Sequence, residues 1–264
     1  MKCLSAWLVA LLAATCACGD GKIRLIAHRG GVMEADENTV EAFVDAYSKG
    51  LRAFETDVRM TKDGQLVLMH DDQVDRTTNG HGEIELMTAA QVRQLTTRRS
   101  ERAVPFLCDF LNAFTNKPGV FLQLEVKPGN GPVNEDRLDR FAQTMTALVA
   151  QTLPSATVCY SSFDRRSLAA IRRNAPKASL TLLVNGEPDI KLLATLKELD
   201  CDRVSVLPKK AKPAFVEAAR KAGFRVAGWS VRTDDDLTQA QTLGLESVTT
   251  DCPRRMLANG LGTP

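Results

Sequence analysis

Neither sign of charge dominates this chain of 264 residues. It carries 34 basic and 32 acidic side chains along its whole length, for a formal net charge of +2. No basic stripe forms, so nucleic acid is not an expected partner. The chain also lacks an internal repeat, a linker and a low-complexity tract, and its composition of 44% apolar and 25% charged residues is typical of a soluble globular protein. These absences favour a single domain, which we place at residues 22–260.

Cysteines are few after the N-terminal segment, and their spacing fits no zinc motif. Cys108, Cys159, Cys201 and Cys252 are far apart, in apolar contexts that we expect to be strands or helices. An oxidising compartment would permit disulfides, and four thiols allow three connectivities. Buried free cysteine is, however, a common filler of protein cores. We therefore favour buried, unpaired cysteines.

Long hydrophobic runs are absent except at the N-terminus. A charged start leads into an apolar run from Leu4 to Ala14, which small residues follow up to Cys18. This pattern is typical of a secretory signal peptide over residues 1–17, and the run is too short for a permanent membrane anchor. The segment from Thr15 to Cys18 also resembles a bacterial lipoprotein cleavage site with Cys18 as lipid acceptor; simple cleavage after Ala17 is the alternative. We expect an exported protein of the periplasm or cell envelope, whose link to a membrane is a lipid on Cys18.

Strand-like apolar runs alternate with amphipathic helical stretches along the rest of the chain. This alternation favours parallel strands joined by crossover helices. The stretch from Asn38 to Gly50 illustrates a helix, because Asn38 can cap its first turn, apolar residues follow at helical spacing, and Gly50 ends it. The expected strands are Ile23–His28, Ala53–Arg59, Leu66–His70, Val120–Lys127, Thr157–Phe163, Ser179–Val184, Arg203–Leu207, Arg225–Val231 and Ser247–Asp251.

These nine strands are one too many for a (β/α)8 barrel. Only Thr61–Gln65 separates the second strand from the third, which is too short for a parallel crossover. The pair Asp63-Gly64 is a hairpin turn signal. We therefore predict that the third strand folds back antiparallel, and that the other eight form a single TIM barrel of the α/β class.

The hairpin has two consequences. It would bring His70 back beside Asp57, with the two residues nearly opposite each other on antiparallel partners. The stretch between Asp72 and Ala103, which has no strand pattern, then forms a small insertion after the hairpin strand. We place this insertion on the active-site side of the barrel.

Polar, titratable residues end three otherwise apolar strands, and the carboxyl ends of barrel strands build the active site. Glu55 and Asp57 share one face of a strand, as Glu125 and Lys127 do on another. Alone, Glu55 and Asp57 would be read as a surface salt-bridge face. Three carboxylates at one mouth would repel one another, so a divalent cation is their natural partner, and oxygen ligands suit Mg²⁺ or Ca²⁺. We expect one such cation on Glu55, Asp57 and Glu125.

The chain has only three histidines, and two of them, His28 and His70, end strands beside these acidic groups. Imidazole titrates near neutral pH, which suits a general acid/base pair. A lone histidine at a strand end is more often a satisfied core group, but two beside acidic clusters favour catalysis. His81 lies in a glycine-rich turn and is expected to have no chemical role. Arg29 and Lys127 add positive charge suited to phosphate oxygens, so the set indicates phosphoryl chemistry.

Eight short motifs follow one another in order along the chain: His28-Arg29-Gly30, Glu37-Asn38-Thr39, Glu55-x-Asp57, Thr61-Lys62-Asp63-Gly64, His70-Asp71, Arg76-Thr77-Thr78-x-Gly80, Glu125-x-Lys127 and Thr250-Asp251-x-Pro253. They resemble the signature of the glycerophosphodiester phosphodiesterase family, within the phospholipase C-like phosphodiesterase superfamily. The resemblance implies hydrolysis of glycerophosphodiesters to sn-glycerol 3-phosphate and an alcohol. It also implies that the three carboxylates bind the metal, that the two histidines are the acid/base pair, and that Arg29 and Lys127 bind the phosphate.

Two aromatic residues and one loop concern the choice of substrate. Phe163 and Trp229, near the ends of later strands, match positions where the family lines its substrate pocket, although either is equally compatible with a plain core role. The loop departs from the family pattern: Asp36 replaces the usual Pro, and Val32–Ala35 replaces a small, polar stretch. The resemblance therefore carries over the chemistry but not the alcohol specificity.

Two other functions compete with this interpretation. A lysophospholipase D or sphingomyelinase D-like enzyme uses a related barrel and a similar histidine pair, and an apolar groove would favour it. A non-catalytic exported protein that binds phosphodiesters would be favoured by the loss of one histidine or carboxylate. None of these residues is lost.

Overall fold

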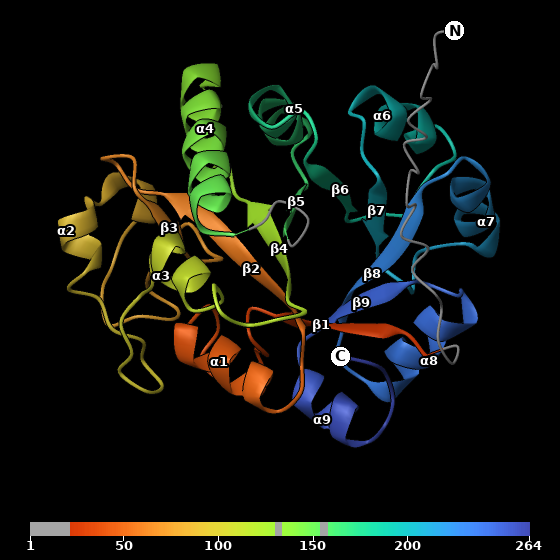
Figure 1. The fold of residues 1–264 in the computed structure, drawn as a ribbon, viewed down its shortest axis with the longest axis horizontal. Helices are drawn as coiled ribbons and strands as arrows, with labels where there is room; N and C mark the ends of the chain where they lie inside the picture. Colours follow the sequence, from red (N-terminus) through yellow and green to blue (C-terminus); the bar gives the residue numbers. More distant parts are fainter. Residues whose placement is uncertain (1–21, 130–133, 154–157) are drawn as a thin grey trace, which may run out of the picture.

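The computed structural model describes residues 22–129, 134–153 and 158–264. Within them, eight parallel strands close into a ring, in which the first strand of the chain pairs with both the last and the second (Figure 1). The predicted TIM barrel is therefore confirmed. The expected signal peptide and Cys18 lie outside the described residues.

Each strand begins and ends within two residues of its predicted limits. Apolar runs bounded by polar or turn residues locate buried strands well, because both faces of a parallel barrel strand are covered. The strands are β1 (Arg24–His28), β2 (Ala53–Met60), β3 (Leu66–Leu68), β4 (Phe121–Val126), β5 (Val158–Ser162), β6 (Ser179–Val184), β7 (Arg203–Val206), β8 (Arg225–Val231) and β9 (Ser247–Thr250). The eight parallel strands pair in the order β1-β9-β8-β7-β6-β5-β4-β2, and β1 also pairs with β2.

Helices cover the outside of the barrel, and Figure 1 shows them as a ring around the strands. Within the described residues, the ring contains α1 (Val40–Ser48), α3 (Leu107–Asn112), α4 (Glu135–Thr152), α5 (Arg165–Asn174), α6 (Leu192–Glu198), α7 (Pro213–Lys221), α8 (Asp234–Thr242) and α9 (Pro253–Ala258). Their apolar faces and the barrel strands share one large core. This frame holds the carboxyl ends of the strands in fixed positions.

The start of α1 differs from the prediction. Thr39, not Asn38, is the N-cap, and its hydroxyl accepts a hydrogen bond from the backbone N–H of Ala42 at 3.3 Å. Asn38 instead has a positive φ of 57° and uses its side-chain amide to bind Asp57. A tertiary contact has therefore overridden the local capping preference. Gly50 follows the helix with a φ of 101°, as its role in ending the helix requires.

The hairpin is confirmed, but its register differs slightly from the expected one. β3 pairs antiparallel with the end of β2, and Val58 lies opposite Leu68. Continuing this register places Met69 opposite Asp57, and the Met69 N–H donates to the Asp57 carbonyl at 3.1 Å. His70 therefore lies one residue beyond the position facing Asp57.

The insertion after the hairpin has a small core of its own. It contains the 3-10 helix η1 (Ile84–Leu86) and the short helix α2 (Ala89–Val92), which pack on Val67 of β3. The neighbouring residues Leu66 and Leu68 point to the main core instead. Because alternate strand residues face opposite sides, β3 joins the insertion to the barrel.

Three of the four described cysteines are buried and unpaired as predicted, whereas Cys108 is free but exposed. Cys108 lies on the outer side of α3, so the expectation that all four are buried was wrong for this residue.

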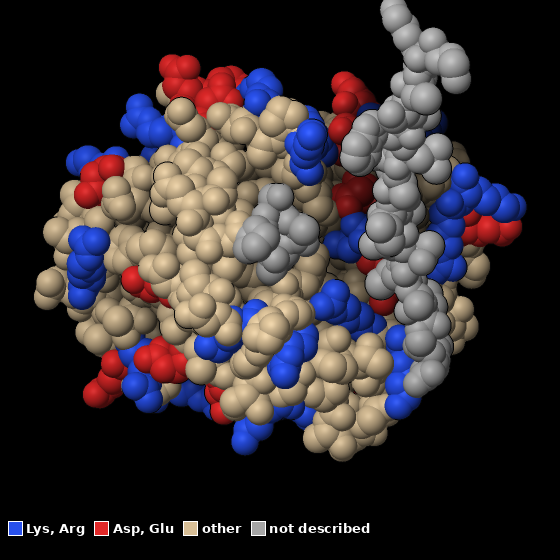
Figure 2. Space-filling model, in the orientation of Figure 1, with Lys and Arg blue, Asp and Glu red and all other residues tan. Residues whose placement is uncertain are grey.

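No helix in the described ranges is long and apolar enough to cross a membrane. On the face drawn in Figure 2, basic and acidic side chains are interspersed, with no continuous basic area.

Candidate active site

Three buried carboxylates meet at the carboxyl ends of β2 and β4. Glu55 and Asp57 belong to β2, and Asp57 lies beside Glu125 in the parallel pairing of the two strands. One carboxylate oxygen from each residue lies within 4.8 Å of the others. The expected cluster is therefore present, and it is the only group of this kind within the described ranges.

Two cations lie against this cluster. The Lys127 ammonium is 2.6 Å from Glu125 Oε1 and 3.2 Å from Asp57 Oδ1. Arg29 places its Nε 2.9 Å from Asp57 Oδ2 on the other side. Asp57 is thus held between both cations, and it also accepts a hydrogen bond from Asn38 Nδ2 at 2.9 Å.

The three carboxylates differ in their affinity for protons. Burial is the main cause that raises the pKa of Glu55 well above its usual value, and Asp57 and Glu125 raise it further. Burial likewise raises the pKa of Glu125 to about 7. Burial acts on Asp57 in the same direction, but Arg29 and Lys127 outweigh it and lower the pKa of Asp57. Without a cation, Asp57 is therefore the most readily ionised of the three carboxylates.

His28 ends β1 beside Glu55. Its Nε2 atom lies 3.8 Å from Glu55 Oε2, and its Nδ1 atom contacts Asp251 Oδ1, just beyond β9. A carboxylate only accepts hydrogen bonds, so this contact places the proton of a neutral ring on Nδ1. Arg232 binds the second oxygen of Asp251 at 2.6 Å.

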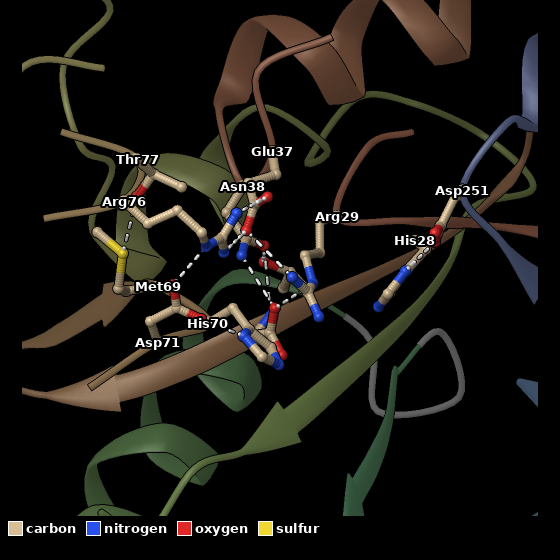
Figure 3. A network of polar contacts seen from close by, with 12 residues as sticks. His28, Arg29, Glu37, Asn38, Met69, His70, Asp71, Arg76, Thr77 and Asp251 are labelled. Carbon is tan, nitrogen blue, oxygen red and sulfur yellow. Dashed lines mark hydrogen bonds and ion pairs between the residues drawn. The ribbon is translucent and has the colours of Figure 1, made fainter. Parts of the chain in front are cut away.

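His70 follows the hairpin strand and lies apart from His28 in the view of Figure 3. Arg59 fixes its backbone by donating from Nε and NH2 to the His70 carbonyl at 3.0 and 2.8 Å. Its Nδ1 atom lies 2.6 Å from Asp71 Oδ1. Burial lowers the pKa of His70 below its usual value. His81, by contrast, is 79% exposed and pairs with Asp75, consistent with a loop residue.

The loop after β1 adopts an unusual backbone to place Arg29. Arg29 has a φ of 51°, and Gly30 and Gly31 follow at 84° and 103°. A Cβ on Gly30 would lie 2.8 Å from that of Ala42, so glycine is also needed for close packing against α1. The same loop carries Glu37, whose Oε1 accepts a hydrogen bond from Arg29 NH1 at 3.1 Å.

An open cleft of about 390 Å³ leads to the carboxylates, and its lining includes His70, Glu125, Lys127 and Phe163. Phe163 is 40% exposed. Its ring packs edge-on against Trp229, with centroids 5.1 Å apart and an interplanar angle of 76°. Trp229 donates from Nε1 to the Val184 carbonyl at 3.2 Å. Phe163 therefore faces the cleft, and Trp229 contacts its ring.

Several site residues appeared in the sequence only as parts of motifs, with no role assigned. Asp251 is one, and Asp71, Glu37 and Arg76 are others. The barrel order could have located Asp251, because the last strand of a closed barrel pairs with the first, which ends at His28. Arg76 gave no such signal, because it reaches Glu37 across 39 residues of chain.

A comparison with known families decides the relationship. The glycerophosphoryl diester phosphodiesterase family matches residues 28–255.

The chain belongs to this family.

Relatives and solved structures agree with that membership. Glycerophosphodiester phosphodiesterase of Caldanaerobacter subterraneus is 28% identical over 248 residues, covering 89% of this chain and 97% of that protein. An Oleispira antarctica phosphodiesterase in complex with the product sn-glycerol 3-phosphate has a TM-score of 0.82, at 24% identity over 90% of this chain and 96% of that one. The Thermotoga maritima glycerophosphodiester phosphodiesterase has a TM-score of 0.70, at 20% identity over 90% and 98%. These two likenesses show the same fold.

Proposed function

We propose that this member of the family hydrolyses glycerophosphodiesters to sn-glycerol 3-phosphate and an alcohol, with one divalent cation. The observation that carries the proposal is the cluster of Glu55, Asp57 and Glu125, with Lys127 and Arg29 against it and with His28 and His70 close by. A cation and two basic side chains at one mouth suit a phosphate group. Membership of the family and the product bound to the Oleispira antarctica phosphodiesterase support the same substrate class.

The three carboxylates fit a hard divalent cation. Glu55 Oε1 is buried and, among the described residues, has no hydrogen-bond partner. A buried polar atom without a partner costs free energy unless a cation or a hydrogen-bond donor binds it. All the ligand atoms that the three residues offer are carboxylate oxygens, which Mg²⁺ and Ca²⁺ prefer. We therefore assign Glu55, Asp57 and Glu125 as ligands of Mg²⁺ or Ca²⁺. When bound, the cation would neutralise charge on the phosphate and make its phosphorus more electrophilic.

Arg29 and Lys127 are assigned to the phosphate oxygens. The Arg29 guanidinium is oriented by Asp57 and by Glu37, at 2.9 and 3.1 Å. Lys127 directly follows β4, two residues after Glu125, and lines the cleft. Both are held by carboxylates before a substrate arrives, so little reorganisation is needed to stabilise charge in the transition state.

His28 and His70 are assigned to the two proton transfers. One imidazole removes a proton from the attacking water as the new oxygen–phosphorus bond forms. The other donates a proton to the alcohol oxygen as its bond to phosphorus breaks. Because each Nδ1 atom contacts an aspartate, each ring presents Nε2 for this exchange. Phe163, together with Trp229 in contact with its ring, is assigned to the carbon atoms of the substrate.

The test uses purified protein and a panel of substrates. Glycerophosphocholine, glycerophosphoethanolamine and glycerophosphoglycerol are assayed beside lysolipids, after chelation and after adding Mg²⁺ or Ca²⁺. We expect glycerol 3-phosphate to be released, chelation to abolish turnover, and one of the two ions to restore it. Full turnover by metal-free protein would contradict the metal assignment. Turnover of lysolipids alone would favour the lipid enzyme, and binding without turnover a binding protein.

We also propose that the protein is exported and lipidated at Cys18. The sequence of the first 18 residues supports this proposal. Expression in a bacterium with labelled palmitate should give a labelled, membrane-bound protein, and Cys18→Ala should remove the label. An unlabelled wild type that is released after cleavage at Ala17 would support simple export.

A further inference from the structure

We infer that Arg76, a side chain of the insertion that is 51% exposed, is a positioning residue for the reaction proposed above. Its Nε atom donates to Asp71 Oδ2 at 2.5 Å. Its other two nitrogens, NH1 and NH2, donate to the two oxygens of Glu37 at 2.8 and 2.7 Å. One guanidinium therefore joins two carboxylates that belong to different loops (Figure 3).

Asp71 contacts both Arg76 and His70. One oxygen of Asp71 binds Arg76, and the other binds His70 Nδ1 at 2.6 Å. This second bond fixes the tautomer and the plane of the imidazole. Asp71 lies in a loop and its side chain is 25% exposed, so the strand framework does not hold it. Its orientation depends on Arg76.

Glu37 contacts both Arg76 and Arg29. Glu37 Oε1 accepts hydrogen bonds from both arginines, at 2.7 Å from Arg76 and 3.1 Å from Arg29. Arg29 in turn contacts Asp57. The contacts form a continuous path from Arg29 through Glu37, Arg76 and Asp71 to His70. The insertion thereby couples a group assigned to the phosphate with a group assigned to proton transfer.

His28 has a similar arrangement with one difference. Asp251 binds His28 Nδ1 with one oxygen and Arg232 Nε with the other. Asp251 is almost fully buried, and its backbone N–H donates to Val231 at 3.1 Å. The barrel itself therefore holds Asp251. Arg232 is itself 65% exposed, but it binds an aspartate that the barrel already holds, whereas Asp71 on the His70 side has no such support.

Arginine is suited to this role and lysine is not. The contacts use three nitrogens of one planar group, in two directions. A lysine ammonium is a single point charge on a flexible stem and cannot bind Asp71 and Glu37 with the same geometry. Arg76→Lys should therefore fail to replace the wild-type residue, although it keeps the charge.

The experiment compares Arg76→Ala, Arg76→Lys and Arg102→Ala in the mature protein, with glycerophosphocholine as substrate and Mg²⁺ added. Arg102 is a matched control: it belongs to the same insertion, is 53% exposed and pairs only at the surface with Glu41, at 3.7 Å. We expect both Arg76 variants to lose about 10- to 100-fold in kcat with melting temperatures near that of the wild type. Arg102→Ala should stay within about twofold. Added methylguanidinium should restore part of the activity of Arg76→Ala.

A double variant tests whether the effect passes through His70. If it does, Arg76→Ala should cost far less in a His70→Ala background than in the wild type. Three results would each overturn the inference. They are losses of the two single variants that multiply in the double variant, full activity of Arg76→Lys, and an activity of Arg76→Ala above half that of the wild type. If Arg76→Ala does not fold, Arg76→Lys and Arg76→Gln decide the question.

A second readout separates this inference from the proposed function. The imidazole ¹⁵N shifts of His70 report its tautomer without any turnover. We expect a fixed Nδ1–H form in the wild type and a mixture in Arg76→Ala. A wild type inactive on every glycerophosphodiester would refute the function, whereas an unchanged His70 spectrum in Arg76→Ala would refute the inference.

Discussion

Glu125→Gln replaces a buried carboxylate by its uncharged isostere, and its effect on stability should depend on both pH and metal. Burial raises the pKa of Glu125 from 4.5 to about 7. Between these two pKa values the folded chain keeps a proton on Glu125 that the unfolded chain has lost, so the free energy of unfolding falls as pH rises. At 1.36 kcal/mol per pKa unit, this shift corresponds to about 3 kcal/mol. Glutamine escapes that loss. In chelator, the variant should therefore match the wild type near pH 4 and exceed it by about 3 kcal/mol at pH 8.

Adding the cation should cancel most or all of this difference. A ligand at a hundredfold excess over its Kd stabilises the folded state by about 3 kcal/mol, and the variant, with one ligand fewer, should gain less. Denaturant titrations measure both effects. They are run at several pH values, with chelator or with about 10 mM Mg²⁺ or Ca²⁺. Glu217→Gln, a surface carboxylate paired with Lys221, is the control and should change stability by less than about 0.5 kcal/mol. A Glu125→Gln protein less stable than the wild type in chelator at pH 8 would refute the reasoning.

Other predictions concern the groups around the metal site. His28→Ala and His70→Ala should each lower turnover by about two to four orders of magnitude, whereas His81→Ala should change little; a large loss for His81→Ala in steady-state assays would show that the pair is misassigned. Asp251→Asn keeps the shape but not the charge beside His28, so kcat should fall with KM nearly constant, and an unaltered kcat would contradict this. Phe163→Ala removes an exposed ring from the cleft and should raise KM more than it lowers kcat, so the opposite split would count against a pocket role.

The strands and the carboxylate cluster were predictable because both depend on short-range pattern. A buried barrel strand is a short apolar run, and its carboxyl end faces the active site in this fold. Glu55 and Asp57 needed only the two-residue period of a strand to share a face. Glu125 joined them because β4 is the next parallel strand beside β2.

Features that depend on tertiary contacts were harder to predict. The turn signal at Asp63-Gly64 located the hairpin, but a turn signal does not set the pairing, and the register placed Met69 rather than His70 opposite Asp57. Asn38 has the chemistry of an N-cap, yet its side-chain amide donates a hydrogen bond to the buried carboxylate of Asp57 instead. In both cases a partner distant in sequence outweighed a local preference.

Cys108 shows a further limit. Its sequence context is apolar, and α3 does bury its neighbours Leu107 and Phe110. Successive helix residues point about 100° apart, so Leu107 and Phe110 share one face while Cys108 points away from it. Local hydrophobicity identified the helix but not which of its sides the thiol occupies.

The closure of the barrel also determines how an anchored molecule would stand on a membrane. β1 begins at Arg24 and ends at His28, so its first residue lies at the base of the barrel and its last at the catalytic mouth. Thr263 pairs with Arg24 at that base, which brings the C-terminal segment to the same end. The six residues from Cys18 to Arg24 span at most about 20 Å. A lipid on Cys18 would therefore tether the base to the bilayer and turn the mouth toward the surrounding solution, where water-soluble phosphodiesters arrive by diffusion.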